Sequence, residues 1–471
     1  MQSKHYDCVI AGAGPAGIFA ALELTAQDPD RRVLMVDNGH HIDKRICPAR
    51  TTGHCMQCDP CSILHGWSGA GAFSDGKLSL SPDVGGRILD YQSRQTADRL
   101  ISYVDAQYVS FGAAGTVHGI GPEVDAIDYE ASRHNIQLIR CPVRHMGTDH
   151  AFEVLRAMYR TLEERPGFSF LPMTTARDLI VEADRVRGLV IETRGGQPET
   201  IYADHVIAAP GRAGAQWLTD ICRAHGLETV SNEVDIGVRV EVPNAVMDHL
   251  TRHLYEAKLV YYSDTFENRV RTFCMNPGGV VSGEYYEGGI AVVNGHSYAE
   301  PEKRTGNTNF ALLVSTRFTE PFDQPIAYGK YIAQLGNMLT GGGVMIQRWG
   351  DLEMGRRTTW SRLNKSTTVP TYTEAVPGDL SFVLPQRHMT SIMEAMRAFD
   401  KIAPGLVSRN TLLYGVEVKF YSSKVKVSPV FETALAGFYA IGDGAGVTRG
   451  LMQASVTGVI AARGIMGQSL S

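Results

Sequence analysis

The sequence contains no apolar run long enough to cross a bilayer, since such a helix needs about 20 residues. Its first residues, "MQSKHYDCVIAGAG", enter an apolar strand almost at once and lack the three-part layout of a signal peptide. The formal net charge is −5, so the chain has none of the basic excess that nucleic-acid binding requires. We therefore expect a cytoplasmic protein that binds neither a membrane nor a nucleic acid.

Cysteine is also scarce, with eight residues in 471, and there is no internal repeat, low-complexity tract or long run of one charge. Structural disulfides are rare in the cytoplasm, so they are not expected here. Glycine, in contrast, is abundant at 49 residues, which suits tight turns and close approach of the backbone to a ligand. Hydrophobic residues at 44% and charged residues at 20% are typical of a soluble globular protein. The length predicts two domains or one elaborated α/β domain.

A dinucleotide-binding pattern stands near the N-terminus. An apolar strand at 6–11 leads into Gly12, Gly14 and Gly17 in the G-x-G-x-x-G spacing, and a helix with an apolar side follows. A second strand ends at Asp37, twenty residues after Gly17. Gly12 permits the tight turn, Gly14 lets the backbone approach a pyrophosphate, and Gly17 lets helix and strand pack closely. The helix N-terminus favours the anion, and Asp37 is placed to accept hydrogen bonds from a ribose hydroxyl.

The alternative is a purely structural glycine turn, and the motif alone does not distinguish FAD from NAD. The strand, the helix and the acid at the expected distance favour nucleotide binding. The candidate cofactor-binding residues of this segment are Gly12, Ala13, Gly14, Pro15, Ala16, Gly17, Asp37 and Asn38.

The C-terminal segment "FYAIGDGAGVTRGLMQASVTGV" favours FAD. A short apolar strand at 438–441 runs into Gly442 and Asp443, and a helix begins near Leu451. The segment resembles FAD proteins of the two-dinucleotide-domain type, in which such an Asp binds the ribitol. The resemblance also implies that the helix directs its positive end at the flavin N1/C2 carbonyl, where negative charge collects on reduction. An ordinary strand–turn–helix is the alternative. The candidate residues are Gly442, Asp443, Gly450, Leu451 and Met452.

Two further segments agree with FAD. Residues 174–211 read as short alternating strands that end in a buried strand at 206–209, a β-meander usual in FAD folds of the glutathione-reductase type. The small residues of "GWSGAGAFSDGKLSL" suit a backbone that runs beside the flavin and the pyrophosphate. These segments contribute the candidate residues Ala70, Ala72, Phe73, Ser74, Ala176, Ala209 and Gly211.

The motifs "GAGAFSDGKLSL", "VDIGVRVE", "RTFCMNPGGVV", "VPTYTEAVPGDLSFVLP", "GVEVKFYSSKVKV" and "GDGAGVTRGLMQA" together resemble a family of largely uncharacterised prokaryotic FAD-dependent dehydrogenases. The resemblance implies an α/β fold: a Rossmann-like FAD-binding domain of the two-dinucleotide-domain type, with a second domain over the flavin. We expect the FAD-binding domain at 1–90, 145–225 and 405–471, and an α+β cap or substrate domain at 91–144 and 226–404.

Four residues are candidates for catalysis. Arg449 and Lys77 are expected near the flavin, as a grip for an anion or for reduced flavin, with a structural or solvated ion pair as the alternative. Cys274 precedes a glycine turn as a candidate acid or nucleophile, although a buried cysteine is more often a small apolar residue. His296 is a candidate proton donor or an exposed turn residue.

The chain has neither a second strand–G-x-G-x-x-G–helix unit nor a C-x4-C pair after the first strand. The layout of the disulfide reductases is therefore not expected, and NAD(P)H is expected only as a transient donor. Cys47, Cys55, Cys58 and Cys61 follow the spacing C-x7-C-x2-C-x2-C, which suits an iron–sulfur cluster or zinc but matches neither pattern fully. Thiol redox chemistry and a purely structural loop remain alternatives.

These features predict an FAD-dependent oxidoreductase that transfers hydride or electrons between flavin N5 and a small organic substrate, with an electron-transfer partner as a further expectation. A flavin-dependent monooxygenase is the alternative, because that group also lacks a second Rossmann unit. A non-catalytic flavin redox sensor is the alternative from another class.

Overall fold

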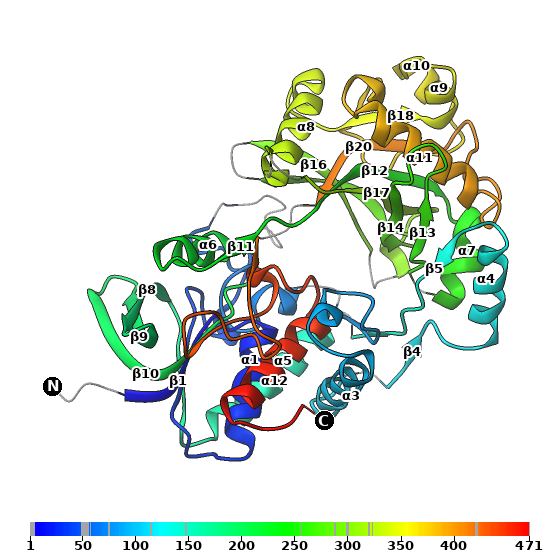
Figure 1. Cartoon of the computed structure of the whole chain (residues 1–471). Coiled ribbons are helices and arrows are strands. Elements are labelled where there is room, and N and C mark those ends of the chain that lie inside the picture. The colour runs from blue at the N-terminus through cyan, green and yellow to red at the C-terminus, as the bar shows by residue number, and fades with distance from the viewer. Residues whose placement is uncertain are drawn as a thin grey trace. The chain divides into compact units, whose positions relative to one another are not determined.

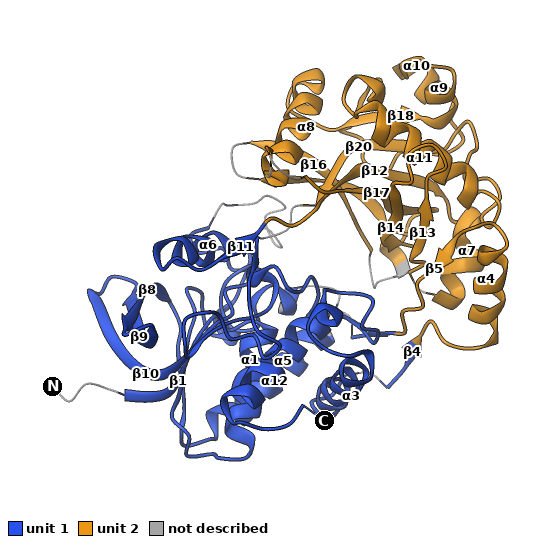
Figure 2. Ribbon diagram, viewed as in Figure 1, with its two compact units in different colours: residues 1–117, 143–230, 422–471 blue, residues 118–142, 231–421 orange. Residues whose placement is uncertain are grey.

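The computed structural model describes residues 5–48, 56, 58–73, 76–113, 115–146, 148–254, 256–286, 289–297, 301–318, 321–322, 324–419 and 423–470. The chain divides into two compact units, which Figure 2 shows in two colours: unit 1 is residues 1–117, 143–230 and 422–471, and unit 2 is residues 118–142 and 231–421. Among the described residues, no helix combines the length and the apolar character that a bilayer crossing needs.

The units differ from the predicted domains at their boundaries. The first crossing lies after residue 117 rather than 90, because helix α3 (Arg94–Ser110) packs against helix α12 (Leu451–Ile465) of unit 1. The last crossing lies after residue 421 rather than 404, because strand β20 (Leu412–Lys419) pairs with strand β12 (Val234–Pro243) of unit 2.

The main sheet of unit 1 has seven strands. They are β1 (His5–Ala11), β2 (Val33–Val36), β7 (Phe168–Leu171), β8 (Thr174–Glu182), β9 (Arg185–Thr193), β10 (Pro198–Ala208) and β22 (Phe438–Ala440). The order is β7–β2–β1–β10–β9–β8, with β22 paired to β10. The pairs among β7, β2, β1, β10 and β22 are parallel, and β8, β9 and the start of β10 form an antiparallel meander. All four residues of β2 are buried, as expected for a parallel strand covered on both faces.

Helix α1 (Pro15–Ala26) is buried around its whole circumference, because α12 and α5 (Thr148–Glu163) contact it (Figure 1). A Cβ added at Gly458 of α12 would lie 2.1 Å from the Ala16 carbonyl oxygen, so this glycine permits the close approach of α12 to α1. The remaining elements of unit 1 are α6 (Ala215–Ala224), β3 (Lys77–Ser79), β6 (Val143–His145), β11 (Thr229–Val230), β21 (Lys424–Val425), and the short 3₁₀ turns at 42–44, 69–73, 88–90 and 443–445. At β4 (Val117–His118) the chain leaves unit 1.

Unit 2 is a mixed sheet with helices, which confirms the predicted fold class. Its eight strands are β5 (Gln137–Leu138), β12, β13 (Leu259–Tyr262), β14 (Arg269–Asn276), β17 (Asn307–Thr316), β18 (Met345–Arg348), β19 (Val376–Pro377) and β20, in the order β19–β18–β20–β12–β17–β14–β13–β5. Only the β18–β19 pair is parallel among these described strands. A separate hairpin is formed by β15 (Val280–Tyr286) and β16 (Ile290–His296). The helices are α4 (Pro122–Ser132), α7 (Asn244–Leu254), α8 (Pro325–Thr340), α9 (Trp349–Glu353), α10 (Trp360–Leu363) and α11 (Gln386–Phe399).

Candidate functional site

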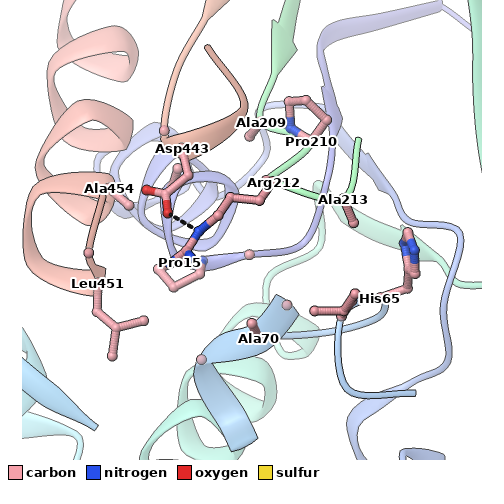
Figure 3. Close-up of a pocket in the computed structure, with 18 of the residues that line it drawn as sticks. Pro15, His65, Ala70, Ala209, Pro210, Arg212, Ala213, Asp443, Leu451 and Ala454 are labelled. Carbon is pink, nitrogen blue, oxygen red and sulfur yellow. Dashed lines mark hydrogen bonds and ion pairs between the residues drawn. The ribbon is translucent and has the colours of Figure 1, made fainter. Parts of the chain in front are cut away.

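Two cavities of about 380 and 320 Å³ lie in unit 1 where its parallel strands end. Residues that follow β1, β2, β10 and β22 line them, as expected for an open α/β sheet that binds its ligand at the carboxyl ends of the strands. The two cavities share Asp37, His65, Pro210 and Ala213, so together they form one continuous candidate site. Figure 3 shows part of the larger cavity, with residues from four separate chain segments around it.

The three glycines of the fingerprint occupy different surroundings. Gly12 has φ +114°, and an added Cβ would lie 2.1 Å from the Ala209 carbonyl oxygen of the neighbouring strand end. A Cβ at Gly17 would lie 2.1 Å from the Gly12 carbonyl oxygen. A Cβ at Gly14 would meet no atom within 4 Å, and Gly14 lines the larger cavity. Gly12 and Gly17 therefore serve packing, whereas the backbone at Gly14 is open to a ligand.

Two helix N-termini meet at the larger cavity. The N-caps of α1 and α12 are Gly14 and Gly450, and neither helix has a side-chain cap or an acidic residue in its first turn. Gly14, Pro15, Gly450 and Leu451 all line this cavity. The first N–H groups of a helix lack partners inside the helix and carry partial positive charge, so this arrangement favours anionic groups between the two ends.

Asp37 fastens the glycine turn to the rest of the site. Its Oδ2 accepts a hydrogen bond from Ala13 N at 2.9 Å, and its Oδ1 accepts from Gly39 N at 2.9 Å and Gly66 N at 2.6 Å. An ionised carboxylate has about four acceptor positions, so roughly one remains for a ligand hydroxyl. The sequence indicated the ribose contact but not these three backbone contacts, which depend on the path of the chain at 39 and 66.

Asp443 is held by two partners at the edge of the larger cavity. Its Oδ1 accepts from Thr448 Oγ1 at 2.6 Å, and its Oδ2 accepts from Arg212 Nε at 3.1 Å (Figure 3). The Arg212 side chain is 75% exposed and lines the cavity. Sequence reasoning missed Arg212, although its position directly after Gly211 at the end of a parallel strand is a usable signal.

Of the four predicted catalytic residues, Lys77 lines the larger cavity. Arg449 is not among the lining residues of either cavity, and its backbone N donates to the Gly85 carbonyl oxygen at 2.8 Å. Cys274 lies on β14 and His296 on β16, so both belong to unit 2 and neither lines these cavities. Of these four residues, only Lys77 is a described lining residue of the two cavities, and the roles of Arg449, Cys274 and His296 stay predictions.

Most of the predicted cofactor residues line the site. The larger cavity is lined by Gly14, Pro15, Ala16, Asp37, Ala70, Ala209, Gly211, Gly442, Asp443, Gly450 and Leu451, and the smaller one by Gly12, Asp37, Asn38 and Ala176. Ala13, Gly17, Phe73 and Met452 line neither cavity. Ser74 and the side chain of Ala72 lie outside the described residues. Lining residues that sequence reasoning missed include Leu64, His65, Ala454, Thr175, Arg177 and Trp217.

Two separate hydrogen bonds hold one wall of the smaller cavity, which contains the missed residues Thr175, Arg177 and Trp217 and the predicted Asn38. Trp217 Nε1 donates to the Arg177 carbonyl oxygen at 3.1 Å, and Thr175 Oγ1 donates to Asn38 Oδ1 at 3.0 Å. Trp217 lies on α6, far along the chain from Asn38, so no local pattern connects them. An indole beside backbone and hydroxyl groups is suited to the flat face of a heterocycle.

The Arg45 side chain binds the backbone on the far side of the cysteine-rich loop, the stretch that carries Cys47, Cys55, Cys58 and Cys61. It is 4% exposed, and its Nη2 donates to the carbonyl oxygens of Ser62 at 2.9 Å and Ile63 at 2.8 Å. Its Nη1 donates to Ser68 Oγ at 2.9 Å and to the Trp67 carbonyl oxygen. Burial lowers the pKa of Arg45 to about 10. One buried guanidinium thus connects Arg45, which precedes the cysteines, to residues 62–68, which follow them. Leu64 and His65 in this second stretch line the larger cavity.

The cysteines of this loop do not form a metal site among the described residues. Cys47 and Cys61 are half-buried, Cys58 is exposed, and none of the three is disulfide-bonded. In the part of the chain that the structure describes, no group of three or more His, Cys, Asp or Glu residues is arranged to hold a metal ion. Cys55 lies outside the described residues, so the four-cysteine set stays a prediction.

Family models match two adjoining parts of the chain. Residues 95–236 match a model described as "FAD binding domain", and residues 233–420 match one described as "FAD-dependent protein, C-terminal domain-like". The chain is an FAD-dependent oxidoreductase. FAD as the cofactor is thus supported, whereas the glutathione-reductase type of FAD fold stays a prediction. The fingerprint at Gly12–Gly17 lies outside both matched ranges, and only the structure connects it to the remaining site.

The chain is similar to an uncharacterized protein of Clostridium beijerinckii, with 26% identity over 483 aligned positions that cover 97% of this chain and 80% of that protein. Among solved structures it is similar to pyridoxine 4-oxidase from Mesorbium loti (13% identity, TM-score 0.45, 98% of this chain and 100% of that chain). A formate oxidase gives 12% identity and a TM-score of 0.46 over 99% of both chains. E. coli quinol fumarate reductase gives 13% and 0.44 over 99% of this chain and 71% of that one.

Proposed function

We propose that the enzyme transfers a hydride, or electrons, between FAD and a small organic substrate. The observation that carries this proposal is the meeting of the uncapped N-termini of α1 and α12 at one cavity. Each N-terminus stabilises an anionic group placed against it. FAD presents two such groups, because its pyrophosphate is charged and its pyrimidine edge gains negative charge on reduction.

The residues present fit FAD along both cavities. The open backbone at Gly14 and the N-terminus of α1 would hold the pyrophosphate. Asp443 would accept hydrogen bonds from the ribitol hydroxyls, and Arg212 and Thr448 keep its carboxylate at the cavity edge. The wall with Trp217 would accommodate the adenosine end. When bound, FAD would supply hydride or electron transfer at flavin N5.

The chain itself contributes orientation, charge and exclusion of water. Lys77 is held at the cavity wall because the backbone of β3 pairs with β6, with Lys77 opposite His145. Its ammonium group would bind an anionic group of the substrate or of the cofactor as a point charge. Leu64, Leu451 and Ala454 supply apolar surface in the same cavity, which displaces water from a ligand there.

Anaerobic reduction of the FAD-loaded enzyme by a panel of small organic donors tests the proposal. The expected result is loss of the oxidised flavin absorbance with at least one donor, at a rate that Lys77→Met lowers by about tenfold or more. Lys44→Met is the matched control, because Lys44 is exposed and outside both cavities, and it should leave the rate unchanged.

Two results would contradict the proposal. Failure of the purified protein to take up FAD would remove its basis. Flavin that no donor reduces, combined with oxygen consumption that needs NAD(P)H and substrate, would replace it with a monooxygenase.

A further inference from the structure

A second, strongly cationic cavity of about 410 Å³ lies wholly within unit 2. Its described lining consists of Arg348, Arg356, Arg362, Lys365, Arg409 and Asn410, with no acidic residue among them. Arg348 ends β18, Arg356 follows α9, Arg362 lies on α10, and Arg409 precedes β20. Five cationic side chains from four segments therefore line one cavity that is partly open to solvent. Such a concentration of charge is costly unless an anion offsets it.

One buried acid partly neutralises this group. Asp351 is fully buried, and its Oδ2 accepts from Arg348 Nε at 3.0 Å, while its Oδ1 accepts from Arg356 Nε at 2.9 Å. Arg362 Nε lies 3.8 Å from the same Oδ1. Burial raises the pKa of Asp351, but the hydrogen bonds from Arg348, Thr358 and Arg356 outweigh it, so this pKa lies below its ordinary value. The acid stays ionised, and one negative charge stands against five positive ones.

The sheet fixes one wall of the cavity, at Arg348, whereas the Arg356 and Arg362 side chains are 42% and 37% exposed at its other walls. Arg348 is 4% exposed, and its position is fixed because β18 pairs with β20, with Arg348 opposite Leu412. Gly350 N donates to the Arg409 carbonyl oxygen at 3.2 Å, and a Cβ at Gly350 would lie 2.7 Å from Arg409 Cβ. Within the described residues, Nε to Asp351 is the only hydrogen bond of the Arg348 guanidinium. Its terminal nitrogens are therefore available to a ligand at the cavity wall.

Residues of α10 and of the turn after it also line an apolar cavity of about 310 Å³, which shares no lining residue with the cationic one. Trp360, Leu363 and Tyr372 line the apolar cavity, and Trp360 is 56% exposed. Its lining residue Ser366 donates from Oγ to the carbonyl oxygen of Asn410, a lining residue of the cationic cavity, at 3.3 Å. A ligand with an anionic group in one cavity and a flat apolar body in the other matches this pair.

From this geometry we infer that unit 2 binds an organic phosphate. The phosphate lies in the cavity of Arg348, Arg356, Arg362, Lys365 and Arg409, and the organic part lies against Trp360. Planar guanidinium groups bind phosphate oxygens in pairs, and several of them around one cavity suit a group with three terminal oxygens. The inference does not depend on the flavin reaction, because both cavities lie in unit 2.

Calorimetric titration of the FAD-loaded enzyme at constant ionic strength tests the site, with phenyl phosphate and inorganic phosphate as probes and terephthalate as a dicarboxylate. Lys365 and Arg409 are exposed, and their side chains make no hydrogen bond within the described chain, so the double variant Lys365→Gln, Arg409→Gln should fold normally. We expect the phenyl phosphate Kd to rise at least about tenfold in this variant. Arg357→Gln, the loss of one exposed neighbouring charge outside the cavity, should change it less than about twofold.

A second variant tests the organic part of the inference. Trp360→Ala should weaken phenyl phosphate binding about fivefold and leave inorganic phosphate unchanged. Equal phenyl phosphate affinity in the wild type and the double variant would overturn the site. Terephthalate binding as tight as that of phenyl phosphate would overturn the inference that the ligand is a phosphate. An equal loss of affinity for phenyl phosphate and inorganic phosphate in Trp360→Ala would overturn the inference that the organic part lies against Trp360. Thermal unfolding of each variant verifies that its fold is intact.

Discussion

Replacing Gly14 with alanine should separate cofactor binding from folding. The backbone at Gly14 has φ −77° and ψ 179°, which any residue adopts, and an added Cβ meets no atom of the protein within 4 Å. In the protein without FAD, alanine should stabilise the folded state by about 0.4–1 kcal/mol, because it lowers the entropy of the unfolded chain. Alanine is also a poorer N-cap than glycine, which should destabilise the folded state by about 0.5 kcal/mol. The free energy of unfolding should therefore change by no more than about 0.5 kcal/mol.

The effect on the cofactor should be much larger. The methyl group would occupy the space through which the pyrophosphate is proposed to pass, and overpacking of this kind costs about 1–3 kcal/mol. Because 1.4 kcal/mol corresponds to a factor of ten, the Kd for FAD should rise about 5- to 150-fold. Fluorescence titration of the apoprotein with FAD measures this change, and urea unfolding without FAD measures stability.

Gly17→Ala is the matched control from the same turn. Its Cβ would lie 2.1 Å from the Gly12 carbonyl oxygen, so the apoprotein itself should lose about 1–3 kcal/mol of stability. The reasoning is refuted if Gly14→Ala binds FAD as tightly as the wild type. It is also refuted if Gly14→Ala destabilises the apoprotein as much as Gly17→Ala does.

Three further changes probe other parts of the structure. Gly458→Ala should lower the free energy of unfolding by about 1–3 kcal/mol, because its Cβ would lie 2.1 Å from the Ala16 carbonyl oxygen; an unchanged Tm would contradict the close approach of α12 to α1. Arg45→Met should lower the free energy of unfolding in urea by about 3 kcal/mol or more, since the carbonyl oxygens of Ser62, Ile63 and Trp67 lose their donor. Arg45→Lys should recover part of this free energy. Equal stability of Arg45→Met and wild type would contradict this role of Arg45. His388 is 5% exposed, and burial lowers its pKa from 6.5 to about 4, so the unfolded state binds more protons between these values. The contribution of neutral His388 to the free energy of unfolding is fully present above pH 6.5, and about 3 kcal/mol of this free energy should be lost as the pH falls to about 4. His388→Gln should flatten this part of the pH dependence of urea unfolding, and an unaltered slope would argue against the shift.

The parts of the site that follow a local pattern were predictable from the sequence. Gly12, Gly14 and Gly17 stand in a fixed spacing between a strand and a helix, and Asp443 follows a short apolar strand before another helix. In each case one short segment contains both the element and the residue that it positions. The α+β class of unit 2 was likewise expected from the sequence.

Contacts that depend on distant segments were not predictable in this way. Arg212 reaches Asp443 over 231 positions, and Gly66 reaches Asp37 because the loop after Arg45 returns to the glycine turn. The cationic cavity of unit 2 is lined by Arg348 and Arg409 from the same end of the antiparallel β18–β20 pair, although they are 61 positions apart in the chain and neither lies in a recognisable motif. The boundary near residue 90 was misplaced because the sequence of α3 does not reveal that its partner is α12.

The pairing of α1 with α12 has a consequence for synthesis of the protein. Glu23 of α1 is bonded to Arg463 of α12, 440 positions later, and α12 also completes the larger cavity. A nascent chain on the ribosome therefore exposes an apolar first helix until α12 has been synthesised, and contacts so far apart form slowly. Unit 2, which is mostly one continuous stretch, is free to fold before that moment. The larger cavity is complete only once α12 has been synthesised, so the supply of free FAD and the protection of α1 by chaperones should together limit the yield of active enzyme.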